Sequence, residues 1–117
     1  MGFDRLPLAL RFGLYGLATA ILLYMCLAPS KALPNVHLWD KAEHAIAWAV
    51  LAGVGLILFP AQPAKIAMFT VSFGVLVEVL QAALPFGRNG DWQDWVADCV
   101  GVAAAFAVYA AVRRLRA

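Results

Sequence analysis

The chain has 117 residues, of which 64% are hydrophobic and only 14% carry a charged side chain, with a formal net charge of +2. A mean hydropathy of +0.80 and a charged fraction well below the roughly 25% of soluble domains exclude an ordinary soluble fold and indicate an integral membrane protein. The length accommodates a single domain, residues 1–117, with four crossings of about 20 residues each.

In chain order, the sequence predicts four transmembrane helices, at residues 8–28, 42–59, 66–84 and 95–112. Proline and glycine mark the short connections between them, most densely from Pro85 to Gly90. Because short connections favour antiparallel neighbours, we expect an all-α bundle with up-down-up-down topology. The apolar runs lack the two-residue alternation of barrel strands, and lipid does not tolerate an open sheet, so strands are excluded.

Small residues predict close contacts between helices. They are Gly13, Gly16 and Ala20 on one face of the first helix and Ala49, Ala52 and Gly53 in the second. Cys26 and Cys99 fall near the same end of their helices, where an oxidising compartment would allow a disulfide, but packing as free thiols is the favoured interpretation. Tryptophans at positions 39, 48, 92 and 95 lie in that same half, three of them where an interfacial belt would sit, and anchoring is the favoured interpretation.

Basic residues predict the orientation of the bundle. If the first crossing runs outward, six of them lie on one side and three on the other: Arg5, Arg11, Lys65, Arg113, Arg114 and Arg116 against Lys31, Lys41 and Arg88. By the positive-inside rule both termini are cytoplasmic. The first apolar run is longer than the core of a cleaved signal peptide and has Arg11 near its start, so we expect it to be retained as a helix.

Acidic residues concentrate on the predicted outer side. Six of the seven lie there: Asp40, Glu43, Glu78, Asp91, Asp94 and Asp98. A charged side chain near the middle of a lipid-embedded helix costs about 2.5–3.5 kcal/mol, so Glu78 and Asp98, which fall within spans, are expected to face a partner or water. The first expectation is a network of these two acids with Arg88 or His44.

Helical spacing gathers these side chains on three helix edges. Asp40 and His44 are four residues apart and share a face, while Lys41 projects about a hundred degrees away. Glu78 and Gln81 share a face of the third helix. The fourth helix carries an i, i+3, i+7, i+10 stripe of Asp91, Asp94, Asp98 and Gly101. All three edges lie at the same end, which predicts a shared polar site in the outer leaflet.

The order and spacing of these motifs resemble the VanZ-like family of small bacterial membrane proteins. The motifs are Asp40-Lys41-x-x-His44, then Glu78-x-x-Gln81, then Arg88-x-x-Asp91-x-x-Asp94-x-x-x-Asp98-x-x-Gly101, over nearly the whole chain. Where the family is expected to have asparagine, this chain has Asp98. The resemblance implies a multi-pass protein of the bacterial cytoplasmic membrane, an association with the cell envelope and, for the founding member, lowered sensitivity to the glycopeptide teicoplanin. It supplies no established reaction.

Three functions are compatible with the site. In a binding protein, Lys41 and Arg88 would engage a phosphate or carboxylate of a lipid, a lipid-linked cell-wall precursor or a glycopeptide, and acids would orient the bases and the ligand's donors: Asp40, Glu78, Asp91 and Asp94. In an enzyme, the catalytic candidates are His44, Glu78 and Asp94, with Asp40 as an alternative partner for the histidine and Arg88 stabilising developing charge. In a structural protein, the same network would only fix helix register.

Other ligands and partners are less favoured by the sequence. Asp91, Asp94 and Asp98 offer hard oxygen ligands that would suit magnesium or calcium in the enzyme, but no cofactor and no resident metal is predicted. A proton- or ion-coupled carrier is disfavoured because no acid lies in the cytoplasmic half of any span, although a homo-oligomer is compatible with the sequence. The C-terminal arginines are expected to meet anionic membrane lipids, and nucleic-acid binding is not expected. His37 is predicted to be a solvated loop residue.

Overall fold

The computed structural model describes residues 3–27, 40–84 and 92–116 of the chain. A short 3-10 helix, η1 (Phe3–Arg5), precedes four α-helices: α1 (Leu8–Leu27), α2 (Asp40–Leu58), α3 (Pro63–Ala83) and α4 (Trp92–Arg116). No strand occurs in the described part. The predicted all-α, four-helix fold is therefore confirmed.

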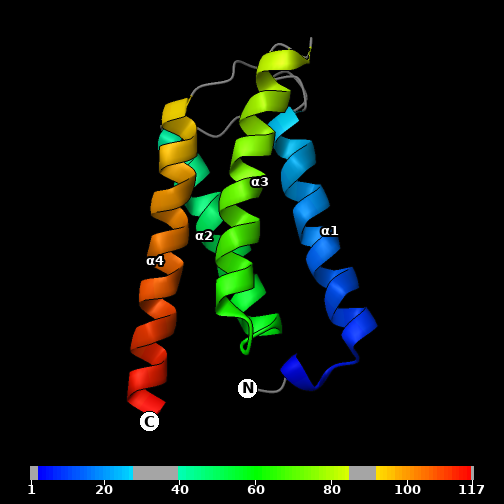
Figure 1. Ribbon diagram of the computed structural model, residues 1–117, viewed down its shortest axis with the longest axis vertical. Coiled ribbons are helices and arrows are strands. Elements are labelled where there is room, and N and C mark those ends of the chain that lie inside the picture. Colours follow the sequence, from blue (N-terminus) through cyan, green and yellow to red (C-terminus); the bar gives the residue numbers. More distant parts are fainter. Residues whose placement is uncertain (1–2, 28–39, 85–91, 117) are drawn as a thin grey trace.

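The helices run alternately up and down in one bundle, with both chain ends at the same end of the molecule (Figure 1). The prediction of up-down-up-down topology is thus confirmed. In this arrangement α2 and α4 run in the same direction, from the end at which α1 and α3 finish toward the end at which α1 starts (Figure 1). The start of α2, the end of α3 and the start of α4 therefore meet at one end, where the sequence places its polar edges.

The helix bounds differ from the sequence prediction mainly at the ends of α3 and α4. The α3 helix begins three residues earlier than predicted, at Pro63, because proline has no N–H to lose in the first turn and its fixed φ suits that position. The α4 helix starts at Trp92 and continues to Arg116, four residues past the predicted end. Arginine is a good helix former and its charge is favourable near a helix C-terminus, so the basic tail extends the helix.

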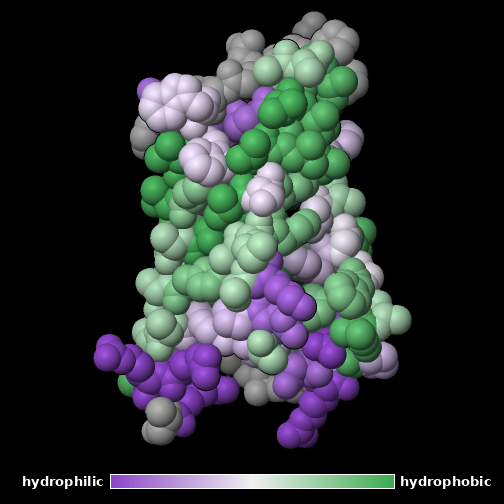
Figure 2. Space-filling model, viewed as in Figure 1, coloured by the Kyte–Doolittle hydropathy of each residue, from purple (hydrophilic) through white to green (hydrophobic). Residues whose placement is uncertain are grey.

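All four helices are long and apolar enough to cross a membrane, which indicates a multi-pass membrane protein. Hydrophobic residues cover most of the visible middle of the molecule, and hydrophilic residues gather at the end with the chain termini (Figure 2). Many large apolar side chains face outward, including Phe12, Ile46, Val79 and Val100. In water such a surface would aggregate, whereas in lipid it is the expected exterior.

The α2 and α4 helices form the most extensive contact in the bundle. Gly101 of α4 lies directly against the backbone of α2, because a Cβ placed there would overlap the carbonyl oxygen of Ala45 and lie 3.0 Å from the amide nitrogen of Ala49. The helices approach this closely because glycine has no side chain. By contrast, α1 is peripheral, with only 11% of its span buried.

The small-residue prediction is wrong for α1 and partly wrong for α2. A Cβ added at Gly13, Gly16 or Gly53 would meet nothing within 4 Å, so these glycines do not mediate a described contact. The close approaches lie instead at Gly55, Gly74 and Gly101. Spacing within one helix identifies a face of small residues, but it does not show whether another helix covers that face.

Side-chain donors connect neighbouring helices through backbone carbonyls. Tyr15 donates to the carbonyl of Leu51 at 3.0 Å, which joins α1 to α2. Arg11 donates to the carbonyl of Leu58 at 3.0 Å and lies over the ring of Phe59, so it caps the C-terminus of α2. Cys26 and Cys99 are not joined by a disulfide, as favoured from the sequence.

Candidate functional site

Five ionisable side chains from three helices meet at the end of the bundle that is opposite the chain termini. We call them the polar cluster: Lys41 and His44 of α2, Glu78 of α3, and Asp94 and Asp98 of α4. All five were singled out from the sequence. The close α2–α4 contact at Gly101 lies one turn below Asp98. It sets the distance between the face of α2 that carries His44 and the face of α4 that carries Asp98.

His44 and Asp98 form the buried centre of the polar cluster. The His44 Nδ1 and the Asp98 Oδ1 are 2.8 Å apart, and Asp98 is fully buried. When Asp98 is ionised, its carboxylate only accepts hydrogen bonds, so His44 then donates from Nδ1 and presents Nε2 on the other side of its ring. The second carboxylate oxygen, Asp98 Oδ2, has no hydrogen-bond partner among the described residues and lies close to Gly74 of α3.

Asp94 lies between the two basic side chains of α2. Its Oδ1 accepts a hydrogen bond from Lys41 Nζ at 3.2 Å, and its Oδ2 lies 3.8 Å from His44 Nε2, beyond hydrogen-bonding distance. Lys41 keeps 25% of its side-chain surface exposed, whereas Asp94 keeps 12%. The sequence placed Lys41 away from the face of His44, but in the structure both contact Asp94, because the long lysine side chain reaches across that angle.

Glu78 brings α3 into the polar cluster. Its carboxylate, that of Asp94 and the imidazole of His44 each offer one atom, and these three atoms all lie within 4.8 Å of one another. Glu78 is half-buried, while His44 and Asp94 are buried. The three groups thus converge from three separate helices, which local sequence proximity alone does not produce.

An aromatic layer supports the polar cluster from below. The ring of Trp48 stacks on His44, with 5.6 Å between centroids and 12° between planes, and its Nε1 donates to the carbonyl of Thr70 at 3.0 Å. Trp95 donates in the same way to the carbonyl of Val71 at 3.1 Å. Trp95 is half-buried and connects α4 to α3, whereas Trp92 is 71% exposed.

The supporting role of Trp48 and Gly74 was not foreseen from the sequence. Trp48 is fully buried, and a Cβ at Gly74 would lie 2.9 Å from Trp95 and 3.0 Å from Asp98 Oδ2. One available signal was the four-residue spacing of Trp48 from His44, which places both on one face of α2.

Gln81 does not join the polar cluster. It is buried and donates from Nε2 to the carbonyl of Cys26 at 2.8 Å, near the C-terminus of α1. That carbonyl is one of the last in its helix, where no intrahelical donor remains. In the structure, Gln81 therefore attaches α3 to the otherwise peripheral α1.

Several predicted site residues lie outside the described part of the structure. Arg88 and Asp91 belong to the segment between α3 and α4, and His37 belongs to the segment between α1 and α2. Asp40 begins α2, but its side chain is likewise not described. The assignment of Arg88, Asp91 and Asp40 to the site stays a prediction, and so does the interpretation of His37 as a solvated loop residue.

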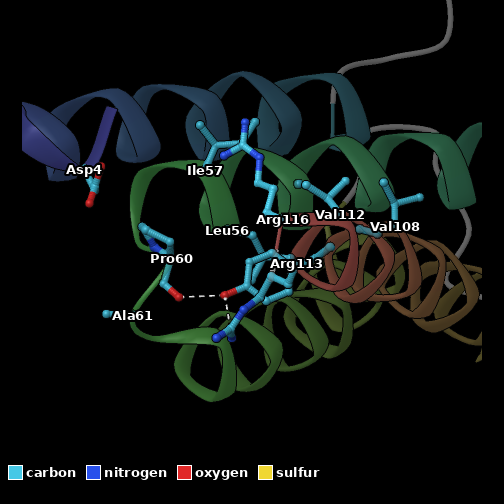
Figure 3. A pocket seen from close by; sticks show the side chains of 12 residues that line it. Asp4, Leu56, Ile57, Pro60, Ala61, Val108, Val112, Arg113 and Arg116 are labelled. Atoms are coloured by element: carbon cyan, nitrogen blue, oxygen red, sulfur yellow. Dashed lines mark hydrogen bonds between the residues drawn. The ribbon is translucent and has the colours of Figure 1, made fainter. Parts of the chain in front are cut away.

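A groove of about 600 Å³ opens at the opposite end of the bundle, between α2 and α4 (Figure 3). Its walls are mostly apolar, and its lining includes Asp4, Arg113 and Arg116. Tyr109 donates to the carbonyl of Pro60 at 2.7 Å and accepts from Arg113 at 3.4 Å. The groove contains none of the predicted site residues, and contact of its arginines with anionic lipid stays a prediction.

The polar cluster can do two kinds of chemistry. Its carboxylates can accept hydrogen bonds from ammonium or hydroxyl groups, and its imidazole can accept or donate a proton or ligate a cation. Comparison of the chain with protein-family models, with curated proteins and with solved structures gave no match.

Proposed function

We propose that the protein is a VanZ-like membrane protein that binds the headgroup of a lipid or a lipid-linked cell-wall precursor at the polar cluster. The observation that carries this proposal is the meeting of Lys41, His44, Glu78, Asp94 and Asp98 at one end of an otherwise apolar bundle. Ionisable groups at this depth are costly in lipid, so a ligand that uses them offsets the cost. A role in envelope homeostasis or in tolerance of glycopeptides such as teicoplanin follows from the family resemblance.

The charges of the polar cluster favour a headgroup that carries hydrogen-bond donors. The polar cluster contains three carboxylates, one lysine and one histidine. The partly exposed Lys41 suits a phosphate oxygen, and Asp94 and Glu78 suit the amine or hydroxyl groups of the same headgroup. Phosphate with a nearby amine or hydroxyl is the chemistry of many lipid headgroups and of sugar-bearing cell-wall precursors.

Selective lipid binding tests this proposal. In nanodiscs, we expect native mass spectrometry to show about tenfold tighter retention of phosphatidylethanolamine or phosphatidylglycerol than of phosphatidylcholine, because only the first two offer amine or hydroxyl donors. Asp94→Asn with Glu78→Gln should remove the preference. Asp4→Asn, an acid exposed at the opposite end, is the matched control and should retain it. Equal retention of all three lipids by the unmodified protein would count against headgroup recognition.

A second candidate is an enzyme that acts on a lipid-linked substrate. The 2.8 Å contact between His44 Nδ1 and Asp98 Oδ1 favours it, because a buried carboxylate that orients a histidine is a common arrangement for general acid–base catalysis. In this function His44 Nε2 moves the proton, and Glu78 or Asp94 assists. Thin-layer chromatography of lipids recovered from the nanodiscs separates the two functions, since a binding protein returns its ligand unchanged.

We also propose that both termini face the cytoplasm of a bacterial cell, with the polar cluster in the outer leaflet. The basic residues of the α4 C-terminus, Arg113, Arg114 and Arg116, support this orientation. Green fluorescent protein fused after Ala117 should fluoresce, because it matures in the cytoplasm. Alkaline phosphatase fused at the same point should be inactive, because it matures only outside the cytoplasm. The opposite pair of results would place the polar cluster in the inner leaflet.

A further inference from the structure

We infer that His44, Glu78 and Asp94 form a binding site for a divalent transition-metal ion such as Zn²⁺ or Mn²⁺. The inference rests on the proposed headgroup function, because a bound cation would let an otherwise acidic site hold a phosphate. The site differs from the magnesium or calcium site considered from the sequence. The earlier site had three carboxylate ligands from one helix. The site inferred here has one imidazole nitrogen and two carboxylate oxygens, and each ligand comes from a different helix.

The three candidate ligand atoms are close enough to share one ion. They lie within 4.8 Å of one another, and adjacent ligands on a Zn²⁺ ion lie roughly 3.0–3.5 Å apart, so the side chains need to close by somewhat more than about 1 Å. Glu78 has three rotatable side-chain bonds and is half-buried, which allows this movement. Asp94 can keep its Oδ1 on Lys41 while its Oδ2, which already faces His44, turns to the ion.

The orientation of His44 is the one that a metal ligand needs. With Asp98 ionised and accepting the Nδ1 hydrogen at 2.8 Å, Nε2 is the nitrogen that faces Asp94, and in a neutral imidazole it carries the lone pair that a metal ion needs. At 3.8 Å from the carboxylate, this nitrogen makes no hydrogen bond to it. A neutral Nε2 that faces carboxylates is unfavourable unless a proton or a metal ion lies between them. An ion coordinated by all three groups supplies a positive charge there.

The charge of the polar cluster matches a divalent cation. With all three carboxylates ionised and His44 neutral, Glu78, Asp94 and Asp98 contribute three negative charges and Lys41 contributes one positive charge, which leaves two negative charges within the cluster. One of them is on the fully buried Asp98, whose Oδ2 has no hydrogen-bond partner in the described part of the chain. A divalent ion one imidazole away neutralises the cluster, which matters most where little water screens the charges.

The ligand types select the class of metal. Imidazole suits zinc and several other transition metals, and carboxylates also suit manganese, whereas calcium and magnesium prefer sites made only of oxygen atoms. Three protein ligands leave at least one coordination position open, as in sites where a metal also contacts a ligand. A phosphate oxygen of the headgroup is the group that this position would accept.

Metal binding by the purified protein tests the inference directly. In detergent without added lipid, one equivalent of Co²⁺ is expected to give visible absorption bands typical of nitrogen and oxygen ligands, and Zn²⁺ should displace it. His44→Ala and Glu78→Gln should each weaken binding at least about tenfold, while Asp4→Asn should bind as the unmodified protein does. Absence of stoichiometric binding by the unmodified protein, or equal binding by His44→Ala, overturns the inference.

Lys41→Gln provides a test that misfolding cannot imitate. Lys41 already occupies one oxygen of Asp94 and places a positive charge beside the proposed ion. Its removal should tighten metal binding about tenfold or more, because a positive charge beside the ion disappears. An unchanged or weaker affinity contradicts a site at Asp94.

The same preparations separate this inference from the headgroup proposal. If nanodisc retention of phosphatidylethanolamine is specific but insensitive to chelation with EDTA, the metal inference fails and the headgroup function stands. If one metal ion binds but no headgroup is preferred with or without it, the metal site stands and the headgroup function fails. The combined proposal requires that chelation lower headgroup retention and that added Zn²⁺ or Mn²⁺ restore it.

Discussion

Replacing Gly101 with alanine is expected to lower the free energy of unfolding by about 3 kcal/mol, at the upper end of the usual range for overpacking. A Cβ at this position would overlap the carbonyl oxygen of Ala45. That oxygen belongs to the backbone of α2 and cannot turn aside as a flexible side chain would, so α2 and α4 must separate. Unfolding in detergent with increasing denaturant, followed by circular dichroism, measures the change.

The matched control for this substitution is Gly53→Ala, which adds the same methyl group to the interior of α2. A Cβ at Gly53 would meet nothing within 4 Å. Because alanine favours helix more than glycine, this variant should be as stable as the unmodified protein or more stable by up to about 1 kcal/mol. If Gly101→Ala is as stable as Gly53→Ala, the close α2–α4 contact is not present in the folded protein.

Replacing Asp98 with alanine is expected to cost about 3–5 kcal/mol, as when one partner of a buried polar pair is removed. The substitution leaves the buried His44 Nδ1 hydrogen without its acceptor and creates a small cavity at the α3–α4 contact. The loss should appear as a large fall in the detergent melting temperature. Asp4→Ala, at an exposed position far from this pair, should melt as the unmodified protein does.

A double variant distinguishes the loss of the pair from the loss of the residue. When His44→Leu is combined with Asp98→Leu, an apolar contact replaces the pair, and much of the stability lost in Asp98→Ala should return. The double variant should nevertheless bind neither metal nor headgroup. If Asp98→Ala alone melts unchanged, Asp98 and His44 do not form the pair that the structure shows.

Much of the fold could be predicted from the sequence because lipid imposes simple rules. Each crossing needs about 20 apolar residues in a helix, and the chain has four such runs separated by proline and glycine. The same rules single out Glu78 and Asp98, whose cost in an apolar span predicts a partner. The pairing of Asp98 with His44 was one of the two expected partnerships, and the structure shows it directly.

What the sequence could not predict are the relations between helices. Spacing puts Glu78 and Gln81 on one face of α3, but it cannot show that Gln81 reaches the end of α1 while Glu78 approaches α4. Likewise, Gly13 and Gly101 look equivalent in the sequence, and only the second touches another backbone. These differences depend on how each helix is rotated about its own axis, which is decided by packing with its neighbours.

The hydrogen bonds from side chains to backbone carbonyls have a consequence for sequence divergence. Each such bond depends on the chemical identity of its donor, as in Tyr15, Trp48 and Gln81, but not on the side chain of its acceptor. Every residue type has a carbonyl oxygen, so Leu51 or Cys26 can be exchanged by mutation without loss of the bond itself. Homologues should therefore retain these donors at aligned positions while the acceptor positions drift freely.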